Sequence, residues 1–126
     1  MSKKYYDEPH MSSERRIEKL QMLLREEIAR ILDREYEFPS GTLVTVTRID
    51  ISPDKRYAAV FISLLGVDPL GALALIKKSV YHIQQMLNRT LRMRPVPQIH
   101  FELDKAELQR ESIEKSLAQL KRKGEL

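Results

Sequence analysis

Five cations and no carboxylate lie between Pro69 and Phe101 of this 126-residue chain. Acidic residues are absent from this stretch although 32% of the sequence is charged. Unopposed Lys and Arg side chains attract phosphates through Coulomb attraction and counterion release, and Arg can bind phosphate oxygens bidentately. The stretch therefore indicates a surface that binds a polyanion. Its cations are Lys77, Lys78, Arg89, Arg92 and Arg94.

All of these cations except Arg94, which follows the helix end, belong to a predicted helix whose other face is apolar. At about 100° per residue, the apolar row points inward, and Lys78, Arg89 and Arg92 share an outward side. An ordinary solvated helix face, with C-terminal cations that complement the helix dipole, explains the same pattern. Both interpretations stay open at this point. The row runs to about Met93 and consists of Leu73, Ile76, Val80, Ile83, Leu87 and Leu91.

An earlier predicted helix, capped by Ser12 or Ser13 and ending near Arg34, carries charges of both signs. Most of its cations alternate with carboxylates. Opposite charges four residues apart on a helix can form ion pairs at the surface. The exposed start of this helix is the better candidate for contacting RNA. The candidates there are Arg15, Arg16 and Lys19.

The sequence contains no pattern for catalysis, a metal ion or a cofactor. It has no Cys, which excludes thiol nucleophiles and thiolate ligands. Its three histidines lack the spacing of metal ligands, and its four glycines are too scattered to form a phosphate loop. Asp50, Asp54 and Asp104 flank a turn or follow a strand, where carboxylates usually bond to backbone or cap a helix. We therefore expect a protein that is not an enzyme.

The periodicity of the chain predicts an α+β domain with a three-stranded sheet. Two segments rich in β-branched residues form a hairpin around a turn at 52–55, and the change of parity after Val46 indicates a bulge near Thr47 or Arg48. Asp68 followed by Pro69 is typical of a helix start. The predicted order is helix 12–34, strand 43–51, strand 57–64, helix 69–93, strand 99–103 and a last helix opened by Asp104.

The predicted domain occupies residues 12–104. Residues 1–11 have no periodicity and are expected to form a disordered leader, and residues 105–126 a charged C-terminal helix or tail. No apolar run is long enough to span a bilayer, and no secretory start is present. A monomer in the cytoplasm, with a polyanion as its partner, is the expectation.

Three segments together resemble ribosome-binding factor A of bacteria. They are ERRIEKLQMLLREEIARIL, TLVTVTRIDISPDKRYAAVFISLLG and LRMRPVPQIHFELDKAELQRESIEKSLAQL. The resemblance covers roughly residues 12 to 120, and its most specific part is a basic helix end followed by Val96-Pro97, alternating apolar residues and Asp104. It implies a KH-like fold of the second type. It also implies a non-enzymatic factor that binds the immature small (30S) ribosomal subunit and its 16S rRNA, and assists late maturation of that RNA, including in the cold.

The resemblance also implies RNA-binding positions and a kink in the long helix. The matching basic residues are Arg15, Arg16, Arg89, Arg92 and Arg94. The family interrupts its helix at Ala-x-Gly, which falls here on Ser79-Val80-Tyr81. Tyrosine resists backbone angles that glycine tolerates, so either a serine hydroxyl bonded to the preceding turn maintains the kink or the helix is straighter. An alternative function is a protein-interaction module, whose open sheet face or C-terminal helix docks a partner.

Overall fold

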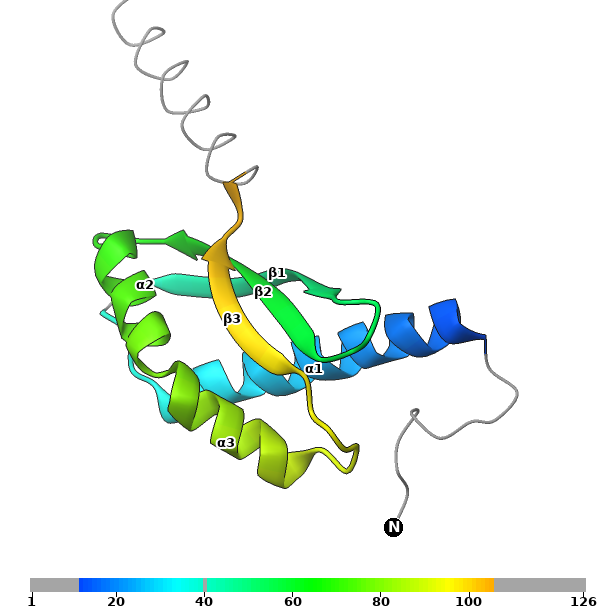
Figure 1. Ribbon diagram of the computed structural model, residues 1–126. Coiled ribbons are helices and arrows are strands. Elements are labelled where there is room, and N and C mark those ends of the chain that lie inside the picture. Colours follow the sequence, from blue (N-terminus) through cyan, green and yellow to red (C-terminus); the bar gives the residue numbers. More distant parts are fainter. Residues whose placement is uncertain (1–11, 40, 106–126) are drawn as a thin grey trace, which may run out of the picture.

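The computed structural model describes residues 12–39 and 41–105 (Figure 1). The predicted leader, and the predicted C-terminal tail after Lys105, lie outside the described residues. Within these residues, three helices and a three-stranded sheet follow the predicted order, except that two helices stand where one long or kinked helix was predicted. The elements are α1 (Ser13–Glu35), β1 (Leu43–Ile51), β2 (Tyr57–Leu65), α2 (Pro69–Lys78), α3 (Val80–Thr90) and β3 (Gln98–Leu103).

α1 begins where the sequence predicts a cap. The Ser12 hydroxyl accepts a hydrogen bond from the backbone N–H of Arg15 at 3.2 Å, which satisfies one of the exposed donors of the first turn. The buried apolar positions of α1 include Leu23 and Leu32 and are spread over more than a narrow row. The helix therefore contributes a broad apolar face to the core, and its buried apolar residues are Leu20, Leu23, Leu24, Ile28, Ile31 and Leu32.

The sheet is mixed, in the order β1-β2-β3. β1 and β2 form the predicted antiparallel hairpin, and β2 pairs with β3 in parallel. The β1–β2 register shifts between Val46 and Arg48, which confirms the predicted bulge. Because Thr47 is the extra residue, Val46 and Ile49 both point into the core despite their opposite parity.

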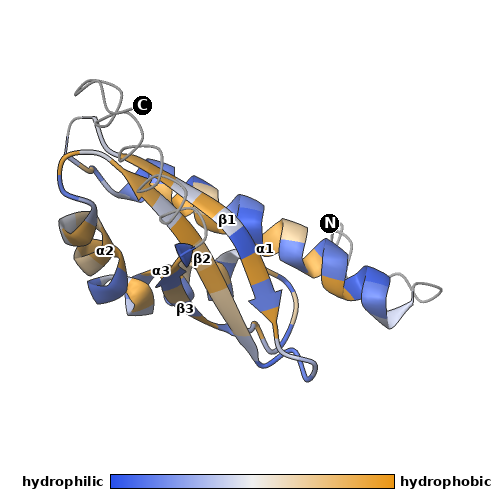
Figure 2. Ribbon diagram, turned by 90° about the horizontal axis from the view of Figure 1, so that it is seen from above, coloured by the Kyte–Doolittle hydropathy of each residue, from blue (hydrophilic) through white to orange (hydrophobic). Residues whose placement is uncertain are grey.

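The two faces of the sheet differ in polarity. On β2, Ala58, Val60, Ile62 and Leu64 are buried in the same core as the helices, whereas the residues between them are only half-buried. Figure 2 shows hydrophobic and hydrophilic residues following one another along β1. The outer face is polar at the edge strands, where Arg48, Asp50, His100 and Glu102 are exposed. The part of the chain described in the structure has no helix long and apolar enough to cross a bilayer.

The helical stretch is interrupted at Ser79, so the alternative of a straighter helix is wrong. The Ser79 hydroxyl donates to the carbonyl of Leu75 at 2.8 Å, and its backbone N–H donates to the carbonyls of Leu75 and Ile76, both at 3.1 Å. These bonds close the last turn of α2, and α3 starts one residue later. The serine bond thus takes part in the kink as predicted, and Tyr81 needs no glycine-like conformation because it lies within α3.

α3 ends at Thr90 and does not reach Met93, which corrects the predicted boundary. Leu91 is already extended, with φ −84° and ψ 140°. The guanidinium of Arg94 turns back and donates to the carbonyls of Asn88, Leu91 and Met93 at 3.1, 2.9 and 2.7 Å. Helix ends leave carbonyls without intrahelical partners, so this arginine stabilises an earlier exit than the prolines alone require.

Gln84 fastens α3 to the start of β3. Its side-chain amide donates to the carbonyl of Pro97 at 3.0 Å, and its amide oxygen accepts from the backbone N–H of Ile99 at 2.8 Å. One side chain therefore satisfies two groups of the segment entering β3. This fixes α3, which carries Arg89, relative to the edge of the sheet.

Candidate RNA interface

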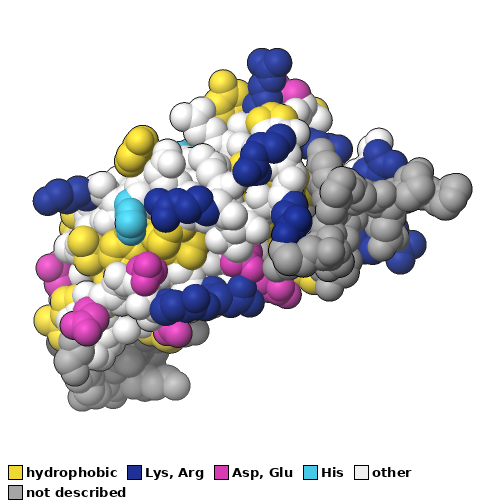
Figure 3. Space-filling model, turned by 90° about the horizontal axis from the view of Figure 1, so that it is seen from below, with side chains coloured by type: hydrophobic (Ala, Val, Ile, Leu, Met, Phe, Trp, Pro, Cys, Tyr) yellow, Lys and Arg dark blue, Asp and Glu magenta, His cyan; other side chains and the backbone are white. Residues whose placement is uncertain are grey.

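Among the predicted cations of α2, α3 and the segment that follows α3, Lys78 and Arg89 carry the most available charges. Both are exposed. Neither forms a salt bridge with another residue in the described ranges. Figure 3 shows Lys and Arg side chains spread over the face on which α3 lies, whereas most Asp and Glu side chains gather toward its lower side. Carboxylates in the described part of the fold therefore do not sequester these two cations.

Arg92 and Arg94 differ in what their side chains do. Arg92 is exposed just after α3 and interacts with another group. Arg94, although also exposed, commits its guanidinium to one carbonyl in the last turn of α3 and two carbonyls just after it. Arg94 therefore has a structural role, and any contact with RNA would have to compete with these hydrogen bonds.

The predicted cations of α1 lie apart from the others. In Figures 1 and 2 the first turns of α1 extend beyond the sheet, at the opposite end of the molecule from α2. Arg15 is exposed there, whereas Arg16 and Lys19 are half-buried and both interact with other groups. The seven predicted residues therefore do not form one compact site.

A hollow between α1 and α3 brings Arg89 beside two other arginines. This α1–α3 hollow has a volume of about 580 Å³. Arg30 and Arg34 line it from the last turns of α1, and Arg89 lines it from the last turn of α3. The other lining residues are Glu27, Ile31, Glu35, Met86 and Thr90.

The carboxylates of this hollow are not equivalent. Glu27 is 4% exposed, and its carboxylate accepts a hydrogen bond from the Arg30 guanidinium at 2.5 Å. A buried carboxylate needs such a partner because desolvation disfavours its charge. Glu35 is exposed at the end of α1. Arg34 and Arg89 form no salt bridge in the part of the chain that the structure describes.

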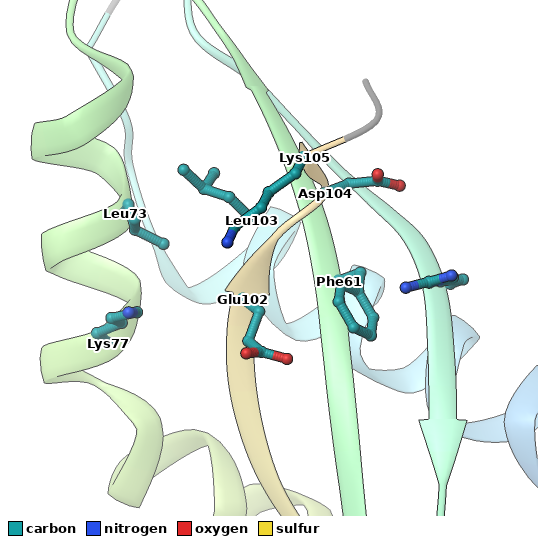
Figure 4. A pocket seen from close by; sticks show the side chains of 8 residues that line it. Phe61, Leu73, Lys77, Glu102, Leu103, Asp104 and Lys105 are labelled. Atoms are coloured by element: carbon teal, nitrogen blue, oxygen red, sulfur yellow. The ribbon is translucent and has the colours of Figure 1, made fainter. Parts of the chain in front are cut away.

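A second hollow, of about 500 Å³, lies at the C-terminal end of β3 (Figure 4). Leu73 and Lys77 of α2 face it from one side, and Phe61 and Glu102 from the sheet. The guanidinium of Arg48 lies 4.0 Å from the centre of the Phe61 ring, a cation–π contact on the outer face. The described lining of this hollow carries three cations and two carboxylates, the same balance as the lining of the α1–α3 hollow.

Residues considered for acid–base or metal chemistry take part in contacts that stabilise the fold. The pKa of Asp54 is lowered, chiefly by the Ser52 hydroxyl, which donates to its carboxylate at 2.6 Å, and further by the Arg56 backbone N–H. This carboxylate therefore stays ionised and orders the β1–β2 turn. The His82 ring packs edge-on against Tyr36, with centroids 6.5 Å apart. Residues 12–39 and 41–105 contain no group of three or more His, Cys, Asp or Glu that could hold a metal ion.

A family model described as ribosome-binding factor A matches residues 16–117. The chain belongs to the ribosome-binding factor A family. The ribosome-binding factor A of Natranaerobius thermophilus is 39% identical over 107 residues, 83% of this chain and 82% of that protein. The corresponding protein of Thermomicrobium roseum is 35% identical over 104 residues, 81% of each chain.

Solved structures of ribosome-binding factor A share the fold. A homology model of the Thermus thermophilus factor, fitted into a cryo-EM map of a 30S complex with that factor, has a TM-score of 0.61 and 25% identity. It covers 69% of this chain and 93% of its own. A crystal structure of the factor from the same species has a TM-score of 0.58 and 23% identity, covering 67% of this chain and 91% of its own. The predicted KH-like α+β fold is thereby confirmed.

Sequence reasoning missed the contribution of α1 to the α1–α3 hollow. The sequence pattern presents Arg30 and Arg34 only as cations that alternate with carboxylates at the surface. A signal was available, because Glu27, Arg30 and Arg34 recur at three- and four-residue spacing and so share one stripe of the helix, beside the buried Ile31. What the pattern could not indicate is that α3 packs along this stripe.

Proposed function

We propose that this protein binds the immature small ribosomal subunit through its 16S rRNA and assists late maturation of that RNA, including in the cold, without catalysing a reaction. Membership of the ribosome-binding factor A family supports the ribosome-binding role. The structural relative at 25% identity, which is described as fitted into a 30S complex, supports the small subunit as partner. The cytoplasm is the compartment in which that partner is assembled.

The exposed position of Arg89 is the main observation in support of an RNA interface on this face. A guanidinium with no ion-pair partner in the described residues can bind a phosphate without first breaking a salt bridge. Lys78 and Arg92 extend the same basic surface along the helical stretch, which contains no carboxylate. Structured RNA is recognised largely through phosphates, 2′-hydroxyls and shape, and cations on rigid helices suit such recognition. In this proposal, a separate part of the RNA contacts Arg15, Arg16 and Lys19. Arg94 has the structural role of holding the end of α3.

Sedimentation of cell lysates tests the proposal. We expect the wild-type protein to travel with free small subunits and not with translating ribosomes. Arg89→Glu combined with Arg92→Glu should abolish this association while circular dichroism remains unchanged. Unchanged co-sedimentation of the double variant would remove this surface from the mechanism.

A protein-interaction module is the second candidate, favoured by exposed apolar side chains at one end of the hairpin. Leu43 and Leu65 are paired across β1 and β2 and are 57% and 41% exposed, and Val67 and Leu70 follow at 87% and 70%. The polar outer sheet face is less suited to an apolar partner. Salt separates the two candidates, because binding through several phosphates weakens steeply with ionic strength and apolar docking does not.

A further inference from the structure

We propose that the α1–α3 hollow is a phosphate-binding site in which Arg34 and Arg89 hold one phosphodiester group of folded RNA from two sides. This inference rests on the proposed function and deepens it, because it adds the last turns of α1 to an interface that the sequence placed on the central helix and on the start of α1. The site takes a phosphodiester or another compact oxyanion.

The dimensions and lining of the hollow suit such a group. Its volume of about 580 Å³ is that of a small-ligand site. Ile31, which is 8% exposed, and the partly buried Met86 provide an apolar surface beside the arginines. Charge interactions next to such a surface are less screened than in open solvent.

The charge balance also favours an anion. Glu27 and Arg30 form a salt bridge with each other, so their charges largely cancel. This leaves Arg34 and Arg89 against the single carboxylate of Glu35 among the described lining residues. Because Arg34 and Arg89 come from different helices, a phosphate between them would satisfy both without bringing the two cations into contact.

The helix dipoles offer a simpler reason for these two arginines. Arg34 and Arg89 each lie in the last turn of their helix, where any cation is favourable. That effect predicts a loss of stability on substitution, and it is satisfied equally well by lysine. A phosphate site predicts a loss of binding, and it favours arginine because only guanidinium binds two phosphate oxygens in a fork. Binding and stability must therefore be measured on the same variants.

Binding of the full chain to immature small subunits, over a series of salt concentrations, tests the site. Arg34→Gln should weaken binding by roughly tenfold, the typical effect of one charge-assisted hydrogen-bonded contact. It should also make the slope of log K against log[salt] shallower, by no more than about 0.7 to 0.9, the value for losing one phosphate contact outright, because Arg89 still contacts the phosphate. Arg34→Lys should recover only part of the affinity. Combining Arg34→Gln with Arg89→Gln should cost less than the sum of the single effects, because both arginines hold one phosphate.

Arg25→Gln is the matched control. Arg25 is exposed on the same helix, nine residues before Arg34 and thus about 180° around it, and it does not line the hollow. We expect wild-type affinity and salt slope for this variant. An Arg34→Gln variant that binds like wild type, or no more weakly than Arg25→Gln, overturns the inference while leaving the proposed function intact.

The proposed function would be overturned if the wild-type protein did not bind small subunits. In that case, titration with inorganic phosphate still tests the phosphate site. The NMR signals of the guanidinium Nε–H groups of Arg34 and Arg89 should shift together and saturate along one curve, while that of Arg25 stays unchanged. Equal, non-saturating shifts at all three arginines would overturn the site.

Discussion

The hydroxyl of Thr47 lies 2.7 Å from a carboxylate oxygen of Asp104, and this hydrogen bond joins the bulge of β1 to the residue that follows β3. The middle strand β2 lies between the two edge strands. The bulge therefore does more than change the parity of β1, because it places a hydroxyl where it can reach across the sheet. Asp104, predicted to bond to backbone or cap a helix, accepts a side-chain hydroxyl here.

Thr47→Val should lower the free energy of unfolding by about 1.5 kcal/mol, the typical value for a hydrogen bond to a charged group. The valine side chain has the same shape but cannot donate to Asp104. Urea denaturation of both proteins measures the difference. Thr45→Val on the exposed side of the same strand is the control, and its effect should stay within about 0.5 kcal/mol. Equal effects of the two substitutions would mean that the bond to Asp104 contributes nothing to stability.

Arg94→Gln should destabilise the protein by about 1–2 kcal/mol, because carbonyls at the end of α3 lose a charged donor. Arg89→Gln, which removes an exposed cation without such bonds, should cost about 0.3–1 kcal/mol through the helix dipole alone. Thermal unfolding at matched pH and salt compares the two. If Arg94→Gln is as stable as wild type, its hydrogen bonds to the helix end are not maintained in solution.

Tyr81→Gly should lower the stability of the fold by about 1 kcal/mol without ending RNA binding, because glycine is a poor helix residue. Tyr81 is 74% exposed in the first turn of α3, so little packing is lost with its ring. Tyr81→Ala separates the causes, since alanine removes the ring but keeps a favourable helix residue, and it should unfold like wild type. Loss of small-subunit binding in a folded Tyr81→Ala variant would instead make this tyrosine a contact residue.

Gly66→Ala should destabilise the protein by about 1–3 kcal/mol through backbone strain and a close contact. Gly66 has φ +143°, and a Cβ atom there would lie 2.9 Å from the Cα of Thr42. Gly41→Ala is the control, because Gly41 also has a positive φ, of +84°, but its Cβ would meet nothing within 4 Å. Chemical denaturation should therefore show a smaller loss for Gly41→Ala. Equal losses would assign the whole cost to backbone angle and none to the contact with Thr42.

The sequence alone determined the order and nature of the elements. The helical spacing in α1, the alternation along β2 and the Asp68-Pro69 start of α2 are local patterns, and each is sufficient to predict its element. The bulge at Thr47 was also predictable, because a parity change between Val46 and Ile49 requires one extra residue. The resemblance carried by the Val96-Pro97 junction led to the correct family and fold.

Only the tertiary structure decided how α3 ends and which cations meet. The early exit at Thr90 depends on Arg94 reaching back to three carbonyls, and the attachment to β3 depends on Gln84. Arg34 and Arg89 are 55 positions apart in the sequence, so no local pattern relates them. They line one hollow because α1 and α3 pack in the same core, and such packing is set by the combined shape of many buried side chains and not by the spacing of any single segment.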